Sequence, residues 1–251
     1  MRAGCAVNTR RDFTLRRESG MKRVANKTVR VAAFAMVVVL ALASCAGLIT
    51  SQARGEFDTG RALFSQGMFE QAIPYFERAI SMDPDFYEAN LYLGRSYLNL
   101  RNYGKALGPL RTAYRLSPED FKKQSVDILV DALLGAALSE ANQGNIGASL
   151  GYVREVLSTD LKAERVREDI SRVLVAVAME LFKSGKVREA IEEYTEAIKA
   201  NPDNSDAYVG LAKALIKNGD FLKALDAASR ALSVNPENTD ALDIMKNSVG
   251  R

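Results

Sequence analysis

Apolar and small residues recur along most of this chain three and four positions apart, the spacing at which an α-helix buries one face. Five segments repeat one pattern, in which a polar turn leads into a helix with an alanine near its start: SQGMFEQAIPYFERA, NLRNYGKALGPLRTA, ANQGNIGASLGYVRE, KSGKVREAIEEYTEA and KNGDFLKALDAASRA. The shared alanines are Ala72, Ala106, Ala148, Ala190 and Ala224, at intervals of 34, 42, 42 and 34 residues. This pattern predicts five pairs of helices joined by tight turns.

The second segment carries the fullest signature, with Leu93-Gly94, Tyr97, Ala106 and Pro118. Leu-Gly-x-x-Tyr followed by Ala and Pro, at a period of 34 residues, resembles the tetratricopeptide repeat (TPR) family. The resemblance implies an all-α fold: a right-handed α-solenoid of about five helix-turn-helix repeats over residues 55–250, with a C-terminal capping helix. The repeats are expected near residues 53–86, 87–120, 129–162, 171–204 and 205–238, and the cap over 239–250.

The middle segment departs from this signature, with Gly135 and Ala136 at the Leu-Gly positions and Asp160 at the proline position. Each 42-residue interval holds eight extra residues, about two helical turns. We expect one unbroken helix over 118–142 and another over 159–184. Two interpretations stay open, because the extra turns either protrude as a docking surface or are length variants that deepen the core.

In TPR proteins the first helix of each repeat lines a concave groove, and five positions of that helix face it. Transferred by the resemblance, the predicted partner-binding groove consists of Arg54, Phe57, Arg61, Phe64, Leu91, Arg95, Leu98, Asn99, Met179, Phe182, Lys183, Lys213 and Lys217. A groove that mixes cations with apolar side chains suits a protein or an extended peptide segment with acidic groups. The alternative is that these cations are solvated surface charges whose stems cover apolar neighbours.

The N-terminal segment has a different character from the repeats. Lys22, Arg23, Lys27 and Arg30 precede an uninterrupted apolar run of 13 residues over 31–43. A basic flank, a short apolar core and small residues after it predict a secretory signal peptide over residues 1–44. Met21 is a better start than Met1, because the first 20 residues make a long and partly acidic leader.

The end of the apolar run is more specific. Leu42-Ala43-Ser44-Cys45 resembles the bacterial lipoprotein signal, in which an acylated cysteine becomes the first mature residue. The resemblance implies lipidation at Cys45, a tether over residues 45–54, and a protein anchored in the bacterial cell envelope. Ala46 in place of Asp favours the outer membrane, facing the periplasm. The alternative is an uncleaved N-terminal transmembrane anchor, although the run is short for a bilayer core of about 30 Å.

Composition narrows the range of ligands and reactions that the repeats could support. Residues 1–44 carry nine basic and two acidic residues, so the remaining chain has a net charge of −4 and no electrostatic reason to bind nucleic acid. Histidine is absent and the two cysteines, Cys5 and Cys45, precede the repeats. The repeats therefore lack the usual zinc ligands and the commonest nucleophiles and bases, and we expect no metal, no cofactor and no enzymatic activity. The sequence predicts a non-catalytic, membrane-tethered scaffold that assembles other proteins.

Overall fold

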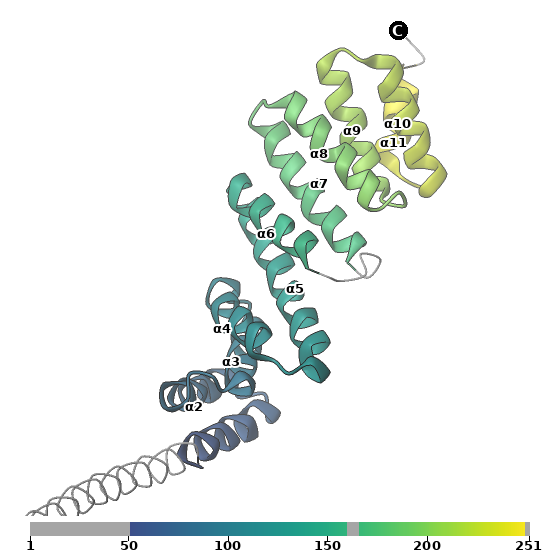
Figure 1. Ribbon diagram of the computed structural model, residues 1–251. Helices are drawn as coiled ribbons and strands as arrows, with labels where there is room; N and C mark the ends of the chain where they lie inside the picture. Colours follow the sequence, from purple (N-terminus) through teal and green to yellow (C-terminus); the bar gives the residue numbers. More distant parts are fainter. Residues whose placement is uncertain (1–50, 160–165, 249–251) are drawn as a thin grey trace, which may run out of the picture. The chain divides into compact units, whose positions relative to one another are not determined.

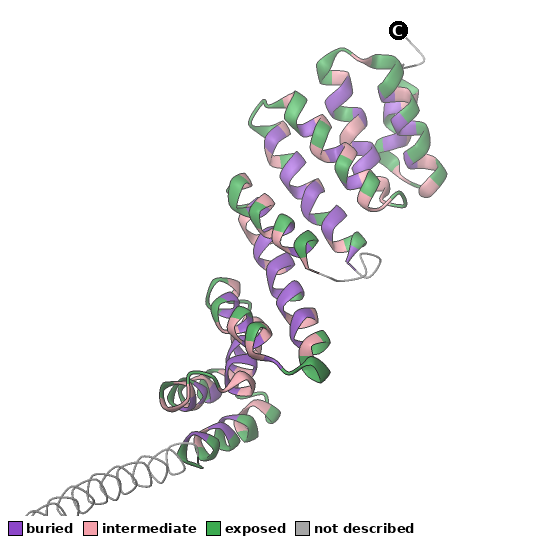
Figure 2. Cartoon of the chain, viewed as in Figure 1, coloured by how far each residue is buried: buried purple, intermediate pink, exposed green. Residues whose placement is uncertain are grey.

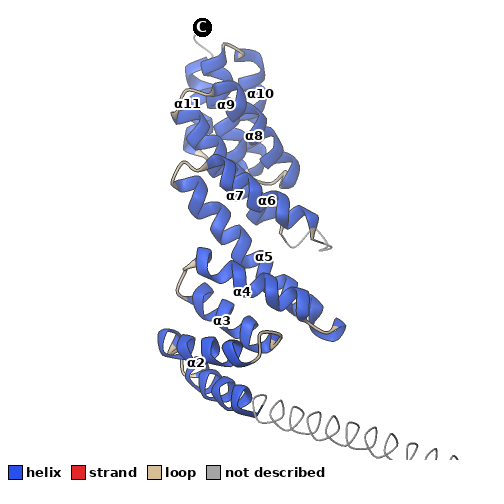
Figure 3. Ribbon diagram, turned by 60° about the vertical axis from the view of Figure 1, so that its left-hand side comes forward, coloured by secondary structure: helices blue, strands red, loops and turns tan. Residues whose placement is uncertain are grey.

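The computed structural model of the chain describes residues 51–159 and 166–248. It divides the chain into two compact units, Met1–Gly55 and Glu56–Arg251. Residues 51–55 of the first unit are helical. In the second unit the helices are residues 56–65, α2 (Phe69–Met82), α3 (Tyr87–Asn99), α4 (Tyr103–Leu116), α5 (Glu119–Asn142), α6 (Ile146–Ser158), α7 (Arg167–Lys183), α8 (Val187–Ala200), α9 (Ser205–Asn218), α10 (Phe221–Val234) and α11 (Thr239–Ser248) (Figure 1). The described residues form helices and turns throughout, which confirms the all-α prediction (Figure 3).

Every turn between the two helices of a repeat has the same backbone geometry. One residue adopts a left-handed conformation, with φ of 54–90° at Gly67, Arg101, Gly144, Gly185 and Gly219. The amide of the next residue donates to the carbonyl five residues back, as in Met68 to Leu63 at 3.0 Å and Asp220 to Leu215 at 2.9 Å. This bond closes the end of the first helix and reverses the chain. Glycine holds four of the five positions because it reaches positive φ without a Cβ clash.

The shared small residue of each repeat lies five positions after that left-handed residue. It is Ala72, Ala106, Ala190 and Ala224 in four repeats, all at 0–1% exposure. In the third repeat it is Ser149, which is fully buried, whereas Ala148 is exposed. The alignment on Ala148 is therefore wrong by one residue. The serine keeps the site small and its hydroxyl donates to the carbonyl of Ala137 at 2.8 Å, so its buried oxygen is satisfied.

Close helix approach explains the small residues on the opposite helix. These residues lie twelve positions before the shared one: Gly60, Gly94, Ala137, Ala178 and Ala212. A Cβ at Gly94 would lie 2.4 Å from Leu110, and a Cβ at Gly60 would lie 2.8 Å from Phe76. In the third repeat the site is Ala137 and not Ala136, the same one-residue correction.

The helices of the second unit form two layers. The odd-labelled helices from α3 to α11 each contact the next odd-labelled helix, and we call them the inner layer. Among the labelled helices, the backbones of no two even-labelled ones approach each other this closely; these form the outer layer. Buried residues line the facing sides of both layers, most continuously along α5 and α7 (Figure 2). Side chains of the outer layer must therefore span the spaces between its own helices.

The two predicted long helices differ in outcome. Helix α5 has 24 residues and ends at Asn142, which confirms the first prediction. Helix α7 has 17 residues and ends at Lys183, one residue before the predicted end, but it begins only at Arg167. Helix α7 therefore lacks most of the predicted extra length, and residues 160–165 lie outside the described part of the chain. Both helices bury part of their extra length, through Leu129 and Ile170, which favours the core interpretation there, whereas Phe121 in the first turn of α5 is 47% exposed.

The predicted capping helix is present as α11, which packs against α9 and α10. An Asn to Ser hydrogen bond links the end of a repeat to the start of its own first helix in two places. Asn204 donates to Ser171 at 2.9 Å, and Asn238 donates to Ser205 at 3.0 Å. The chain entering α11 is thus fixed in the same way as the chain entering α9.

The predictions for the signal peptide, Met21 and Cys45 fall on residues outside the described part of the chain. Within the described part, no helix combines the length and the apolar character needed to cross a membrane.

Candidate functional site

An arginine stacked on two aromatic rings marks the inner layer near its N-terminal end. The Arg95 guanidinium lies 5.0 Å from the ring centre of Phe64 and 5.1 Å from that of Tyr92. The two rings meet edge to face at 5.1 Å. Arg95 and Phe64 were both predicted groove residues, and the structure brings them into contact. A cation over aromatic rings leaves its N–H groups free to point along the ring plane toward an acceptor.

The neighbouring Arg61 is more loosely held. It is about half exposed, lies 3.5 Å from Asp58 one turn earlier, and sits 5.9 Å from the Phe57 ring centre. A surface pair of this kind is worth only ~0.2–1 kcal/mol, so Arg61 can exchange Asp58 for an acidic partner at little cost.

Two predicted groove residues are buried instead of lining a surface. Phe57 is 2% exposed and packs on Phe86 and Phe76, with ring centres 4.9 and 5.9 Å away. Leu91 is 5% exposed within the main core. Family positions alone place both in the groove, but here a large apolar side chain at that position fills the space between helices. Phe57 and Leu91 support the surface from beneath.

Other predicted residues near this end are less distinctive. Leu98 is half-buried against the core. The exposed Asn99 donates back to the carbonyl of Arg95 at 2.8 Å. Arg54 belongs to the first unit, Met1–Gly55.

The C-terminal end of the inner layer repeats the cation-on-ring arrangement. The Lys217 ammonium lies 4.8 Å from the ring centre of Phe182. Phe182 and Phe64 occupy equivalent positions, eight residues before the shared residue of their repeats, and each is covered by a cation from the following repeat. Lys213 pairs with Asp240 of α11 at 2.7 Å.

Lys183 and Met179 complete the predicted set. Lys183 pairs with Glu180 on its own helix. Met179 is 45% exposed, one of the largest apolar side chains open to solvent in the inner layer.

Between these ends is a hollow that the one-residue misalignment concealed. A cavity of about 260 Å³ between α5 and α7 is lined by Asp131, Leu134, Gly135, Leu138, Asp169, Arg172 and Val173. With Ser149 as the shared residue, Asp131, Leu134 and Leu138 occupy the groove positions of the third repeat. Arg172 is held by Asp169 and Glu168, each at 3.0 Å. The middle of the inner layer is thus apolar with a paired charge at its edge.

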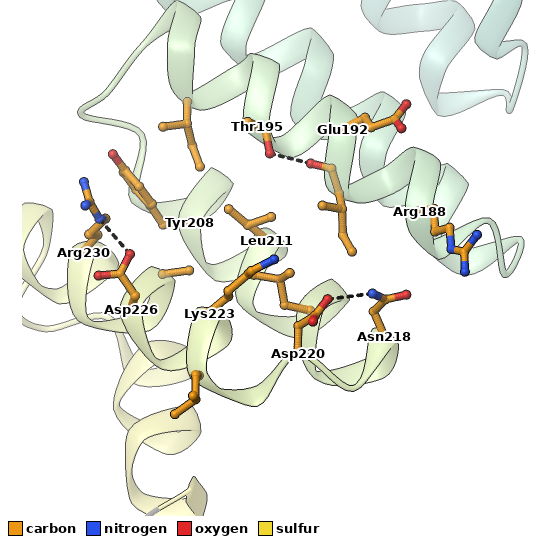
Figure 4. Close-up of a pocket in the computed structure, with 15 residues that line it drawn as sticks. Arg188, Glu192, Thr195, Tyr208, Leu211, Asn218, Asp220, Lys223, Asp226 and Arg230 are labelled. Atoms are coloured by element: carbon orange, nitrogen blue, oxygen red, sulfur yellow. Dashed lines mark hydrogen bonds and ion pairs between the residues drawn. The ribbon is translucent and has the colours of Figure 1, made fainter.

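A second hollow is on the outer layer, at a place that the sequence pattern does not indicate. It has a volume of about 860 Å³ and lies between α8 and α10, with its floor on α9 (Figure 4). We call it the C-terminal trough. The floor is apolar, from Ile191, Ile198, Leu211, Leu215 and Ala227, and charged side chains stand along both walls. A sequence pattern does not show such a hollow because its depth depends on which side chains cross it.

Among the described residues, no cluster of acidic residues or cysteines could hold a metal ion. Burial raises the pKa of Tyr194 to about 12, so this phenol stays protonated as a core residue. Burial and the hydrogen bond to Glu77 raise the pKa of Tyr97.

Comparisons with known proteins found similar solved structures. No curated protein sequence matches the chain. Three similar solved structures are YrrB, described as a TPR protein with an unusual peptide-binding site (18% identity, 76% of this chain and 90% of that chain, TM-score 0.46), MamA (18%, 74% and 93%, 0.48), and MamA residues 41 to the end from Desulfovibrio magneticus RS-1 (14%, 75% and 97%, 0.44).

The family comparison is more specific. The tetratricopeptide repeat family profile matches residues 57–121 and 176–242, together more than half of the chain. The unmatched stretch between them holds the third repeat, where Ser149 and Ala137 replace the usual residues. Repeats of this kind stack into extended surfaces that bind other proteins, and they generally act as non-catalytic scaffolds. The chain belongs to the tetratricopeptide repeat family.

Proposed function

We propose that the inner layer binds an extended protein segment that carries acidic residues at two separated places. The observation that carries this proposal is the repeated cation-on-ring pair, Arg95 on Phe64 and Lys217 on Phe182. Each pair presents a cation and an apolar ring side by side, which fits an acidic residue next to an apolar one. The apolar hollow by Leu134 and Leu138 lies between them in the repeat order.

The proposal includes a membrane tether. Lipidation at Cys45 would hold the repeats at a bacterial envelope membrane, with the segment before the first repeat as a short linker. The support is the sequence of Leu42 to Cys45 at the end of an apolar run. A tethered scaffold of this kind would serve the assembly of an envelope complex, such as a pilus, a secretion system or an outer-membrane assembly.

Binding is tested with the full chain in mild detergent and an array of extended peptides that differ in the number and spacing of their aspartates. The Arg61→Ala/Arg95→Ala variant should bind the acidic peptides at least about tenfold more weakly, since hydrogen bonds to charged groups contribute about 1.5–3 kcal/mol each. The matched control is Lys105→Ala/Arg115→Ala, which removes two exposed cations from α4 in the outer layer. Equal capture of the same peptides by wild type and the Arg61/Arg95 variant would refute the assignment.

The tether is tested separately by Cys45→Ser in cells fed a labelled fatty acid. Lipidation predicts that the label disappears and an unprocessed precursor accumulates. An uncleaved transmembrane anchor predicts no change in size or in the membrane fraction. The second result would leave the binding surface standing and remove the lipid.

A further inference from the structure

Side chains close the spaces between outer-layer helices at the N-terminal end of the molecule. Between α2 and α4, Tyr97 rises from the floor and donates to Glu77 at 3.1 Å. The Lys105 ammonium then lies 5.7 Å from the centre of the same ring. This space is filled by its own walls and floor.

The next two spaces also carry interactions between their walls. Between α4 and α6, Arg111 reaches across and donates two hydrogen bonds to Glu155, both at 2.7 Å. Between α6 and α8, the charge of Arg154 acts on Glu193 and opposes the rise in that carboxyl pKa.

The C-terminal trough has the same positions but different residues. Counted from the shared residue, Leu215 replaces Tyr97, Thr195 replaces Arg111, and Arg230 replaces Glu155. Leu215 has no hydroxyl to reach a wall, Thr195 donates to its own helix at Ile191, and Arg230 pairs with Asp226 on its own helix at 3.1 Å. Among the residues that line the trough, no hydrogen bond or ion pair links α8 to α10 (Figure 4). The space therefore stays open.

Two cations stand at the end of the trough where α8 and α10 begin. Arg188 and Lys223 stand near the starts of α8 and α10, where the amide ends of both helices add positive partial charge. Among the described residues neither is in an ion pair, while Asp220 at the same end accepts from Asn218 at 2.7 Å. One turn further along α8, Glu192 adds a negative charge to the wall. Leu222, 84% exposed, extends the apolar surface at this end.

We propose that the C-terminal trough is a second protein-binding site, which accepts an amphipathic helix of a partner protein. The apolar stripe of that helix would lie on Ile191, Leu211 and Ala227, and acidic residues in its first turn would lie between Arg188 and Lys223. An open, elongated hollow with an apolar floor and charged walls matches helix-in-groove recognition. This site is on the opposite layer from the inner-layer surface and does not depend on it, so the scaffold could hold two partners at once.

Two synthetic stapled helices of about four turns, the length of α8 and α10, test the proposal. They share a leucine stripe and differ only in the first turn, which carries two glutamates in one and two lysines in the other. Fluorescence anisotropy with the full chain in mild detergent should show at least about tenfold tighter binding of the glutamate helix. Equal binding of the two helices would overturn the charge assignment and with it the proposal.

A variant that closes the C-terminal trough tests whether the helix binds there. Thr195→Arg/Arg230→Glu copies the Arg111–Glu155 pair across the trough and should weaken the glutamate helix at least about tenfold. The matched control, Lys199→Glu/Ser233→Arg, makes the same charge change on exposed positions of α8 and α10 outside the trough. The Arg61→Ala/Arg95→Ala variant should bind normally; loss of binding there would move the site to the inner layer and refute the trough.

A second variant keeps the test decisive if the closing pair disturbs folding. Arg188→Glu/Lys223→Glu changes only exposed side chains and should reverse the preference, so that the lysine helix binds more tightly. An unchanged preference would contradict the proposal. A negative result here would disprove the trough site but not the inner-layer binding surface, because the two experiments use different variants and different probes.

Discussion

The third repeat and the repeats around it build the same hairpin from different residues. The second repeat uses Gly94 against Leu110 and has Ala106 at the shared position, whereas the third uses Ala137 and Ser149. Both turns pass through a left-handed residue and close with the same hydrogen bond, 2.8 Å in one and 2.9 Å in the other. The difference shows that the fold requires a small side chain at the crossing and a residue that tolerates positive φ. It does not require a particular amino acid at either place.

The largest expected difference in stability is between two variants that place the same large side chain at neighbouring positions of α6. Ser149→Leu inserts a branched side chain where the helices cross, and should cost about 3 kcal/mol by overpacking. Ala148→Leu places the same side chain on an exposed position and should change stability by less than about 0.5 kcal/mol. Urea unfolding of the full chain, followed by circular dichroism, measures both as shifts of the midpoint.

The opposite order of effects would show that Ala148, and not Ser149, is the crossing residue. Ser149→Ala separates size from hydrogen bonding within the same site. It keeps the crossing small and removes only the bond to the Ala137 carbonyl, so the expected loss is about 1 kcal/mol.

A smaller difference in stability is expected between alanine substitutions at two helical glycines. A Cβ at Gly210 would lie 2.2 Å from the ring of Tyr194, which is 3% exposed and cannot move aside. Gly210→Ala should therefore cost about 1–3 kcal/mol, in spite of the better helix propensity of alanine. A Cβ at Gly151 of α6 would meet no atom within 4 Å apart from its chain neighbours and the backbone of its own helix, so Gly151→Ala should stabilise by up to about 1 kcal/mol. Melting temperatures that move in the same direction for both variants would contradict this account.

The sequence predicted the parts of the fold that repeat. The paired helices, the tight turns between them and the capping helix all follow from local pattern, and the structure confirms them. The alignment failed in the third repeat because Ala148 and Ser149 are both small and adjacent, and only burial distinguishes them. The start of α7 at Arg167 was missed because Thr159-Asp160 resembles a helix start, although the helix begins seven residues later.

The candidate sites were less predictable for a related reason. Family positions indicate which way a side chain points but not how deeply it sits, so Phe57 and Leu91 were placed on a surface that they support from below. The C-terminal trough is open because Leu215, Thr195 and Arg230 do not bridge the space between α8 and α10. The pattern of a single repeat does not reveal this. Depth and openness come from pairs of side chains on different helices.

The smallest expected effect concerns Glu193, where the third repeat meets the fourth. Burial raises the pKa of this carboxyl, the neighbouring charges of Glu196 and Glu192 raise it further, and Arg154 of α6 lowers it. Because the folded-state pKa is above that of the unfolded chain, the protonated group favours folding. This contribution is fully present below the unfolded pKa of about 4.3 and is lost as the pH rises through the higher folded value.

Glu193→Gln should therefore raise the melting temperature at pH 7 and lose that advantage near pH 4. Thermal unfolding of both proteins across this range measures the difference, with Glu189→Gln, an exposed carboxyl on the same helix, as the control. A constant difference between wild type and Glu193→Gln at all pH values would show that packing, and not the buried charge, sets the stability of this junction.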